Sequence, residues 1–223
     1  MTPSVKPIAI IPARGSSKRL PRKNILPWKG IPLIGHCIIN ALATELFSEV
    51  VVSSEDQEIL EISERYGASA LKREAGLSKD NSTVAEVCLD VMSNYENIIE
   101  FCCIYPTAVK LSPETVKKSS EIFQKTKICD FLMGVSLYNY PPQQALIQDE
   151  NGDLILLNPE FKNIQSQFYK KCFVSNGTLY WARTYAFLEQ KNFYGKKLHP
   201  FIIDEEQVSD INTPEDYDIL IKS

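Results

Sequence analysis

Long hydrophobic runs and the two common glycine-rich nucleotide loops are missing from this sequence of 223 residues. No stretch approaches the roughly 20 apolar residues that cross a membrane. The first residues, MTPSVKP, also lack the apolar region of a signal peptide. We therefore expect a cytoplasmic protein with no membrane partner. Residues 8–24 contain neither G-x-G-x-x-G nor G-x-x-x-x-G-K-[ST], which excludes a dinucleotide fingerprint and a Walker loop in this segment.

Metal-binding and disulfide patterns are also missing. The two histidines, His36 and His199, stand too far apart in sequence for a local metal motif. None of the six cysteines is spaced C-x-x-C, and most lie in apolar runs such as IEFCCIY. Buried reduced thiols are the natural interpretation, not disulfides or a zinc site. The net charge of −4 argues against nucleic acid as the main partner.

The most informative segment that is present is residues 8–24, IAIIPARGSSKRLPRKN, in which an apolar run leads into a basic loop. The cations of this loop are Arg14, Lys18, Arg19, Arg22 and Lys23. Lys and Arg neutralise phosphate oxygens, and small residues let backbone N–H groups approach them closely. The small residues here are Gly15, Ser16 and Ser17, and Asn24 adds a neutral donor and acceptor. We interpret the loop as a polyanion site, although a merely solvated basic loop is the alternative.

Strand and helix patterns alternate along most of the chain. Strands are predicted at 8–11, 50–52, 99–104, 131–135, 178–182 and 198–203. Helices are predicted at 32–43, 59–66, from 82 or 83 to about 95, from 113 onward, at 183–189 and from 214 to the end. This rhythm predicts an α/β fold, a Rossmann-like three-layer sandwich with a mostly parallel sheet. Ligands bind such folds beyond the carboxyl ends of the strands, where the basic loop leaves the first strand.

Helix starts carry clear capping signals. Ser82 or Thr83 can cap the third helix, and Glu86 completes a capping box if Thr83 is the cap. Ser112 precedes a proline at the first position of the next helix, and Thr213 does the same for the terminal helix.

The alternation breaks between residues 138 and 171. Asn151-Gly152 lies between the apolar runs 145–147 and 154–157, which predicts a hairpin. We expect a single domain over residues 1–223, with 138–171 as an inserted segment that serves as a lid or a dimer contact. An ordinary meander at the sheet edge is the alternative. Because an isolated domain would struggle to cover this aromatic segment, we expect a homodimer.

Four segments together resemble the acylneuraminate cytidylyltransferase family, whose members make CMP-activated sialic-acid-like sugars. They are ARGSSKRLPRKN, VVVSSEDQEI, KREAGLSKDNST and SDINTPEDY. Four further pieces resemble the branch that uses pseudaminic acid: CIYPTA, YPPQQAL, NPEF and the pair Ser166-Gln167. SNGTLYW is instead closer to the sialic acid and legionaminic acid branches.

The resemblance implies an enzyme that activates a nine-carbon 2-keto sugar acid, pseudaminic acid or a close relative, with CTP and Mg²⁺. It implies catalytic roles for Arg14, Lys23 and Asp210. It implies substrate contacts for Ala13, Gly15, Ser16, Ser17, Lys18, Asn24, Arg73 and Ser82. Asp210 and Asn212 are the metal candidates, although the family commonly has an aspartate in place of Asn212. Without the resemblance, helix capping ahead of Thr213 is the preferred interpretation of Asp210-x-Asn212.

The sugar contacts are the least determined. Gln144 and Gln165 stand where the pseudaminic acid branch tends to have arginines, and Tyr105 stands where the sialic acid branch has a glutamine. The candidate amide or cationic partners for the sugar carboxylate are Gln143, Gln144, Gln165, Lys110 and Lys162. Three alternatives stay open: a CMP-sialic or CMP-legionaminic acid synthetase, a nucleotide-sugar synthetase for another base, and a binding protein with an impaired metal site.

Overall fold

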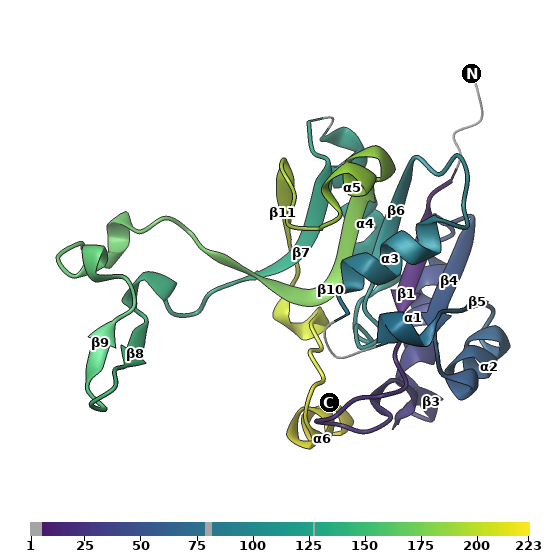
Figure 1. The fold of residues 1–223 in the computed structure, drawn as a ribbon, viewed down its shortest axis with the longest axis horizontal. Helices are drawn as coiled ribbons and strands as arrows, with labels where there is room; N and C mark the ends of the chain where they lie inside the picture. The colour runs from purple at the N-terminus through teal and green to yellow at the C-terminus, as the bar shows by residue number, and fades with distance from the viewer. Residues whose placement is uncertain (1–5, 79–81, 127) are drawn as a thin grey trace.

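The computed structural model describes residues 6–78, 82–126 and 128–223. Its central sheet contains the strands Ile8–Pro12 (β1), Glu49–Ser54 (β4), Ser69–Lys72 (β5), Glu100–Ile104 (β6), Phe131–Leu137 (β7), Phe173–Arg183 (β10) and Leu198–Ile202 (β11). Two separate two-stranded sheets pair Pro27–Trp28 (β2) with Ile31–Pro32 (β3), and Leu146–Gln148 (β8) with Leu154–Leu156 (β9). The seven strands of the central sheet follow the order β11-β7-β10-β6-β1-β4-β5 (Figure 1).

Neighbouring strands of the central sheet run parallel except at β10, which is antiparallel to both β6 and β7. The prediction of a mostly parallel sheet is therefore confirmed. The sequence did not predict that β10 runs against its neighbours, nor the presence of β5 and of the β2–β3 hairpin. A strand's direction depends on its distant partners, which local periodicity does not reveal.

Helices cover both faces of this sheet, as expected for a three-layer sandwich. They are Leu33–Ala43 (α1), Gln57–Arg65 (α2), Val84–Met92 (α3), Pro113–Lys125 (α4), Thr184–Gln190 (α5) and Pro214–Ile221 (α6). Side chains of α1, α2, α4 and α6 join one core cluster, and those of α3 and α5 join the other. In the described ranges, none of these helices has the length and apolar character needed to span a bilayer.

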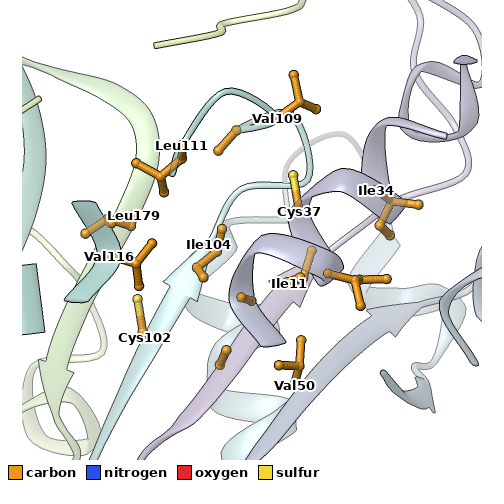
Figure 2. Packing of buried hydrophobic residues seen from close by; sticks show 14 of the residues in the cluster. Ile11, Ile34, Cys37, Val50, Cys102, Ile104, Val109, Leu111, Val116 and Leu179 are labelled. Carbon is orange, nitrogen blue, oxygen red and sulfur yellow. The ribbon is translucent and has the colours of Figure 1, made fainter. Parts of the chain in front are cut away.

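The alternation of side chains along β1 divides the core between the two faces. Ala9 and Ile11 pack in the cluster under α1, whereas Ile8 and Ile10 pack in the cluster under α3. Figure 2 shows Ile11 beside Ile34 and Cys37 of α1. Each fully buried aliphatic side chain of this kind contributes about 1.5–3 kcal/mol to folding. The six cysteines are all free thiols, and five of them are buried, as predicted.

The capping signals are confirmed. Thr83, not Ser82, caps α3, and it forms the expected capping box with Glu86. Ser112 caps α4 with Pro113 at the first helical position. Thr213 caps α6 in a second capping box, with Asp216.

Residues 138–172 form an arm that projects from the ends of β7 and β10, with the β8–β9 hairpin far from the body (Figure 1). The predicted hairpin is confirmed. The alternative of a meander at the edge of the main sheet is wrong, because β8 and β9 pair only with each other. No side chain of the arm belongs to either of the two described core clusters.

Candidate active site

The strand order reverses beside β1. The chain runs from β1 to β4 and β5 on one side and then returns to β6 on the other. The loops that follow β1 and β6 therefore diverge at the carboxyl edge of the sheet, which is where open α/β sheets bind ligands. A cavity of about 280 Å³, the central cavity, lies at this edge. It is lined by Pro12, Arg14, Lys23, Asn24, Arg73, Leu77, Ser82, Thr83, Val84, Val87, Tyr105, Pro106 and Thr107.

The lining of the central cavity combines two kinds of chemistry. Arg14, Lys23 and Arg73 bring cationic groups to it, and hydroxyl and amide groups add neutral hydrogen-bonding capacity. Val87 and Tyr105 belong to an apolar portion of the same wall. A cavity with cations on one part and an apolar, partly aromatic surface on another suits a ligand that joins anionic groups to a flat ring.

A second cavity of about 300 Å³, the cationic cavity, adjoins the first and shares Arg14 and Lys23 with it. Its lining residues are Arg14, Ser17, Lys18, Arg19, Lys23 and Asn212. The predicted polyanion loop thus brings four of its five cations together. Arg22 is the exception, because its guanidinium pairs with Asp56 and Glu58 at the start of α2.

Lys23 links the basic loop to the C-terminal segment. Its Nζ donates to the Ile211 carbonyl at 2.9 Å and to Asn212 Oδ1 at 3.2 Å. Burial lowers the pKa of Lys23, Asp210 raises it, and Arg14 lowers it further, so that the net shift is downward. Lys23 therefore holds a half-buried positive charge close to other cations, which favours an anion at this position.

Asp210 and Asn212 form one hydrogen-bonded unit. Asn212 Nδ2 donates to Asp210 Oδ1, and the Asn212 backbone N–H donates to Asp216 Oδ2 at 2.9 Å. Hydrogen bonds from the Asn212 and Thr213 N–H groups lower the pKa of Asp216. The capping alternative for Asp210 is wrong, because Thr213 and Asp216 supply the cap of α6.

The residues at 210–216 fit a divalent cation that arrives with a polyanion. Among the described residues, no three His, Cys, Asp or Glu side chains gather as a metal site. Magnesium, however, commonly takes one or two protein oxygens and completes its octahedron with phosphate and water oxygens. The exposed Asp210 carboxylate offers one such oxygen beside the cationic cavity, and the Asn212 amide lines that cavity.

The backbone N–H groups of two residues predicted to contact substrate are already bonded within the protein. The Ala13 N–H donates to the Ser53 carbonyl at 3.0 Å, and the Gly15 N–H donates to Glu55 Oε1 at 2.8 Å. Gly15 is needed for close packing instead, because a Cβ there would lie 2.3 Å from Asp56 Oδ2. The expectation that the Gly15 N–H faces phosphate is therefore corrected. Ser16 is exposed and lines none of the cavities described here.

Asn24 is buried in the wall of the central cavity and has spare hydrogen-bonding capacity. Its Nδ2 donates to the Arg14 carbonyl at 2.9 Å, which ties the end of the loop to its beginning. Its Oδ1 is buried and has no hydrogen-bond partner among the described residues. A buried amide oxygen without a partner is costly, so its position favours a ligand that donates a hydrogen bond.

A third cavity of about 370 Å³, the aromatic cavity, shares Thr83, Val84 and Tyr105 with the central cavity. Its other lining residues are Ala85, Tyr180, Lys191, Asn192, Phe193 and Tyr194. Burial raises the pKa of Tyr105, whose ring meets Tyr180 edge-on at 5.3 Å. The sequence analysis missed most of this cavity. Its one available signal was the cluster KNFY at 191–194, which follows a predicted helix.

The amide and lysine candidates for sugar contacts lie elsewhere within this chain. Gln144, Gln165 and Lys162 are exposed on the arm, and Gln143 is buried at its base. Gln143 Nε2 donates to the Lys170 carbonyl, whereas its Oε1 has no hydrogen-bond partner in the part of the chain that the structure describes. None of these side chains lines the central, cationic or aromatic cavity as described.

Comparisons with known proteins find relatives that are named for the transfer of CMP. A family model described as Cytidylyltransferase matches residues 8–211. The pseudaminic acid cytidylyltransferase of Campylobacter jejuni serotype O:2 is 34% identical over 217 residues, covering 95% of this chain and 93% of that protein. The CMP-N,N'-diacetyllegionaminic acid synthase of Legionella pneumophila is 32% identical over 222 residues, covering 94% and 92% of the two chains.

Solved structures share the fold at low sequence identity. A CMP:2-keto-3-deoxy-manno-octonic acid synthetase in complex with CTP matches with a TM-score of 0.73 and 16% identity, covering 97% of each chain. A Mycobacterium tuberculosis H37Rv protein in complex with manganese matches with a TM-score of 0.59 and 11% identity, covering 98% of this chain and 99% of that one.

The position of Lys23 predicts a measurable loss of anion affinity. Lys23→Ala should weaken the binding of inorganic triphosphate about tenfold, the equivalent of one charge-assisted contact. Isothermal titration calorimetry measures the dissociation constant directly. Lys118→Ala, an exposed lysine of α4, is the control and should bind as the wild type does. Equal affinities in the two variants would show that the basic loop is merely solvated.

Proposed function

The chain belongs to the cytidylyltransferase family, and on that premise we propose that it transfers CMP from CTP to a nine-carbon 2-keto sugar acid, pseudaminic acid or a close relative. One observation carries the proposal. The central cavity joins the cationic cavity through Arg14 and Lys23, and it joins the aromatic cavity through Tyr105. Such a row of cavities suits a triphosphate, a nucleoside and a sugar in sequence.

CTP fits the first two cavities by its chemistry. The triphosphate carries several negative charges, and Arg14, Lys18 and Lys23 bring positive charge to the cationic cavity. The cytidine portion occupies the central cavity, where the buried Asn24 Oδ1 accepts a hydrogen bond from a nucleoside donor. Arg73 and Ser82 line the same cavity and supply further polar contacts.

The reaction needs positioning and charge neutralisation more than covalent help from the protein. The anomeric hydroxyl oxygen of the sugar forms a bond to the α-phosphorus of CTP, the bond to the bridging oxygen breaks, and pyrophosphate leaves as the hydroxyl proton is released. Arg14 and Lys23 line both cavities that the nucleotide spans, so they hold the phosphates and offset the charge on the leaving group.

We propose magnesium as the divalent cation. When bound, it would supply positive charge that offsets the negative charge of the phosphates and of the leaving group. Asp210 would hold it through the carboxylate, and Asn212 would contribute its amide oxygen or orient Asp210 through their hydrogen bond. Lys23 reaches the same amide oxygen at 3.2 Å, so the metal candidates and the main phosphate cation lie together.

The aromatic cavity is the proposed sugar site. Its aromatic surface suits the apolar faces of a sugar ring, and Lys191 and Asn192 bring a cation and an amide for a carboxylate and N-acyl groups. The pseudaminic acid relative supports that sugar, and the legionaminic acid relative makes its sugar the leading alternative.

The arm is the proposed dimer contact, and residues 1–223 the proposed single domain. Large apolar side chains of the arm are open to solvent in one chain, including Tyr140, Leu154 and Phe168. A two-stranded sheet has little stability on its own, so a second copy that covers the arm explains its composition. We also propose a reducing cytoplasmic setting, because all six cysteines are free thiols.

We predict a strong preference for CTP over ATP, GTP and UTP. The family membership and the match of the basic loop to the cytidylyltransferase pattern motivate this expectation. Pyrophosphate release is measured for each nucleotide in the presence of magnesium and a panel of nonulosonic acids. Pseudaminic acid should give the highest kcat/KM. Equal release from all four nucleotides would contradict the proposed function.

Asp210→Ala should abolish magnesium-dependent turnover without lowering the melting temperature, since it removes a metal oxygen and no helix cap. Asn212→Asp should retain activity and bind the metal at least as tightly, because it adds a carboxylate. Manganese binding followed by electron paramagnetic resonance in the presence of CTP reports the affinity without turnover. A fully active Asp210→Ala enzyme would remove the proposed metal site.

Light scattering at micromolar concentration should give twice the 25.3 kDa mass of one chain. Leu154→Asp places a charge on an arm residue that is 69% exposed and should shift the protein toward monomers. Ile99→Asp changes an equally apolar residue that is 60% exposed on the body, and it should leave the mass unchanged. A monomeric wild-type protein would overturn the dimer proposal.

A further inference from the structure

We propose that Glu55 is a positioning residue of the nucleotide site, whose carboxylate holds the basic loop and Arg73 in a single arrangement. The inference rests on the proposed function, because the loop and Arg73 line the cavity assigned to CTP. Glu55 itself lines none of the three cavities, so it acts on the nucleotide only through the groups that it holds.

The two oxygens of this carboxylate have separate partners. Glu55 Oε1 accepts a hydrogen bond from the Gly15 N–H, and Oε2 accepts one from Arg73 Nη2, both at 2.8 Å. Gly15 directly follows Arg14, which lines both the central and the cationic cavity. Arg73 comes from the segment after β5 and lines the central cavity. One side chain at the end of β4 therefore fixes groups that reach the cavity from its two flanking strands.

The charge on Glu55 is part of its role. The Arg73 side chain is only 3% exposed, and a guanidinium buried to that degree needs an anionic partner. Burial raises the pKa of Glu55, but hydrogen bonds from its own N–H, Gly15 and Arg73 outweigh burial and lower it. The carboxyl group is consequently ionised at neutral pH and accepts from both partners at once.

The neighbouring Asp56 holds the outer part of the same loop. It pairs with Arg22 and caps α2 through the Ile59 N–H at 3.1 Å. Its side chain also occupies the space that a Cβ at Gly15 would need. The two adjacent acids thus hold different parts of the site. Asp56 holds the end of the basic loop through Arg22, and Glu55 holds Gly15 and Arg73 beside the cavity.

Substitution of Glu55 by glutamine tests whether the residue needs two hydrogen-bond acceptors. Two donors, the Gly15 N–H and Arg73 Nη2, converge on this side chain. A glutamine amide offers one acceptor oxygen and one donor group, so it satisfies one partner and repels the other. Glu55→Gln conserves the shape of the side chain and its burial while it removes this pairing and the charge.

Glu55→Gln should raise the dissociation constants of CTP and of inorganic triphosphate about tenfold, in line with the loss of a charge-assisted contact. KM for CTP should rise more than kcat falls, because the residue positions binding groups and does not touch the reacting atoms. The amide hydrogen of Gly15 should exchange with solvent about tenfold faster, as nuclear magnetic resonance measures in the absence of any ligand. Glu61→Gln changes an exposed acid of α2 that accepts a hydrogen bond from Gln57 and lines none of the three cavities. It is the matched charge control and should behave as the wild type.

A rescue experiment separates positioning from general damage. In the double variant Glu55→Gln with Arg73→Gln, the new amide at 73 accepts from the amide at 55, which frees the oxygen at 55 for the Gly15 N–H. Slow exchange at Gly15 should return, while CTP affinity stays low because Arg73 is gone. Unchanged exchange in Glu55→Gln, or triphosphate affinity equal to that of Glu61→Gln, would overturn the proposal. A wild-type protein that does not bind CTP would contradict the proposed function instead. The role of Glu55 would still be tested in that case, because amide hydrogen exchange at Gly15 and the binding of inorganic triphosphate are both measured without CTP.

Discussion

The reversal of strand order beside β1 is the constraint on which the site depends. β1 pairs in parallel with β4 on one side and with β6 on the other, so the carboxyl ends of all three strands lie at one edge of the sheet. The segments that follow these strands therefore begin at that edge. The segment after β1 brings the cations, the one after β4 brings Glu55, and the one after β6 brings Tyr105. The alternating burial of β1 holds this arrangement, since each face of the strand packs in a different core cluster.

Local signals predicted the framework and the cationic side of the candidate site. Thr83, Ser112 and Thr213 begin their helices as their capping patterns indicate, because a cap acts over three or four residues of one chain segment. The basic loop was recognisable for the same reason: its cations all fall between residues 14 and 23, and four of them line the cationic cavity.

Long-range contacts set the limit of prediction. Lys23 meets the Ile211 carbonyl across 188 positions of sequence, and no local pattern indicates that pairing. The hydrogen bond from the Gly15 N–H to Glu55 is equally impossible to read from local sequence, although both residues follow strands that the sequence predicted. The aromatic cavity was missed because it combines Tyr105 with residues from β10 and from the loop after α5, and the antiparallel direction of β10 was not predicted.

The edge strand β11 has a consequence for how this protein behaves at high concentration. It pairs with β7 on one side only, and it contains Pro200, which has no N–H to offer a further strand. At the opposite edge, β5 spans only Ser69–Lys72, so it provides a short template for pairing. Neither edge supports the continuous backbone pairing that drives aggregation of open sheets. The self-association proposed for the arm uses side chains and not the edges of the sheet, so a change in one need not alter the other.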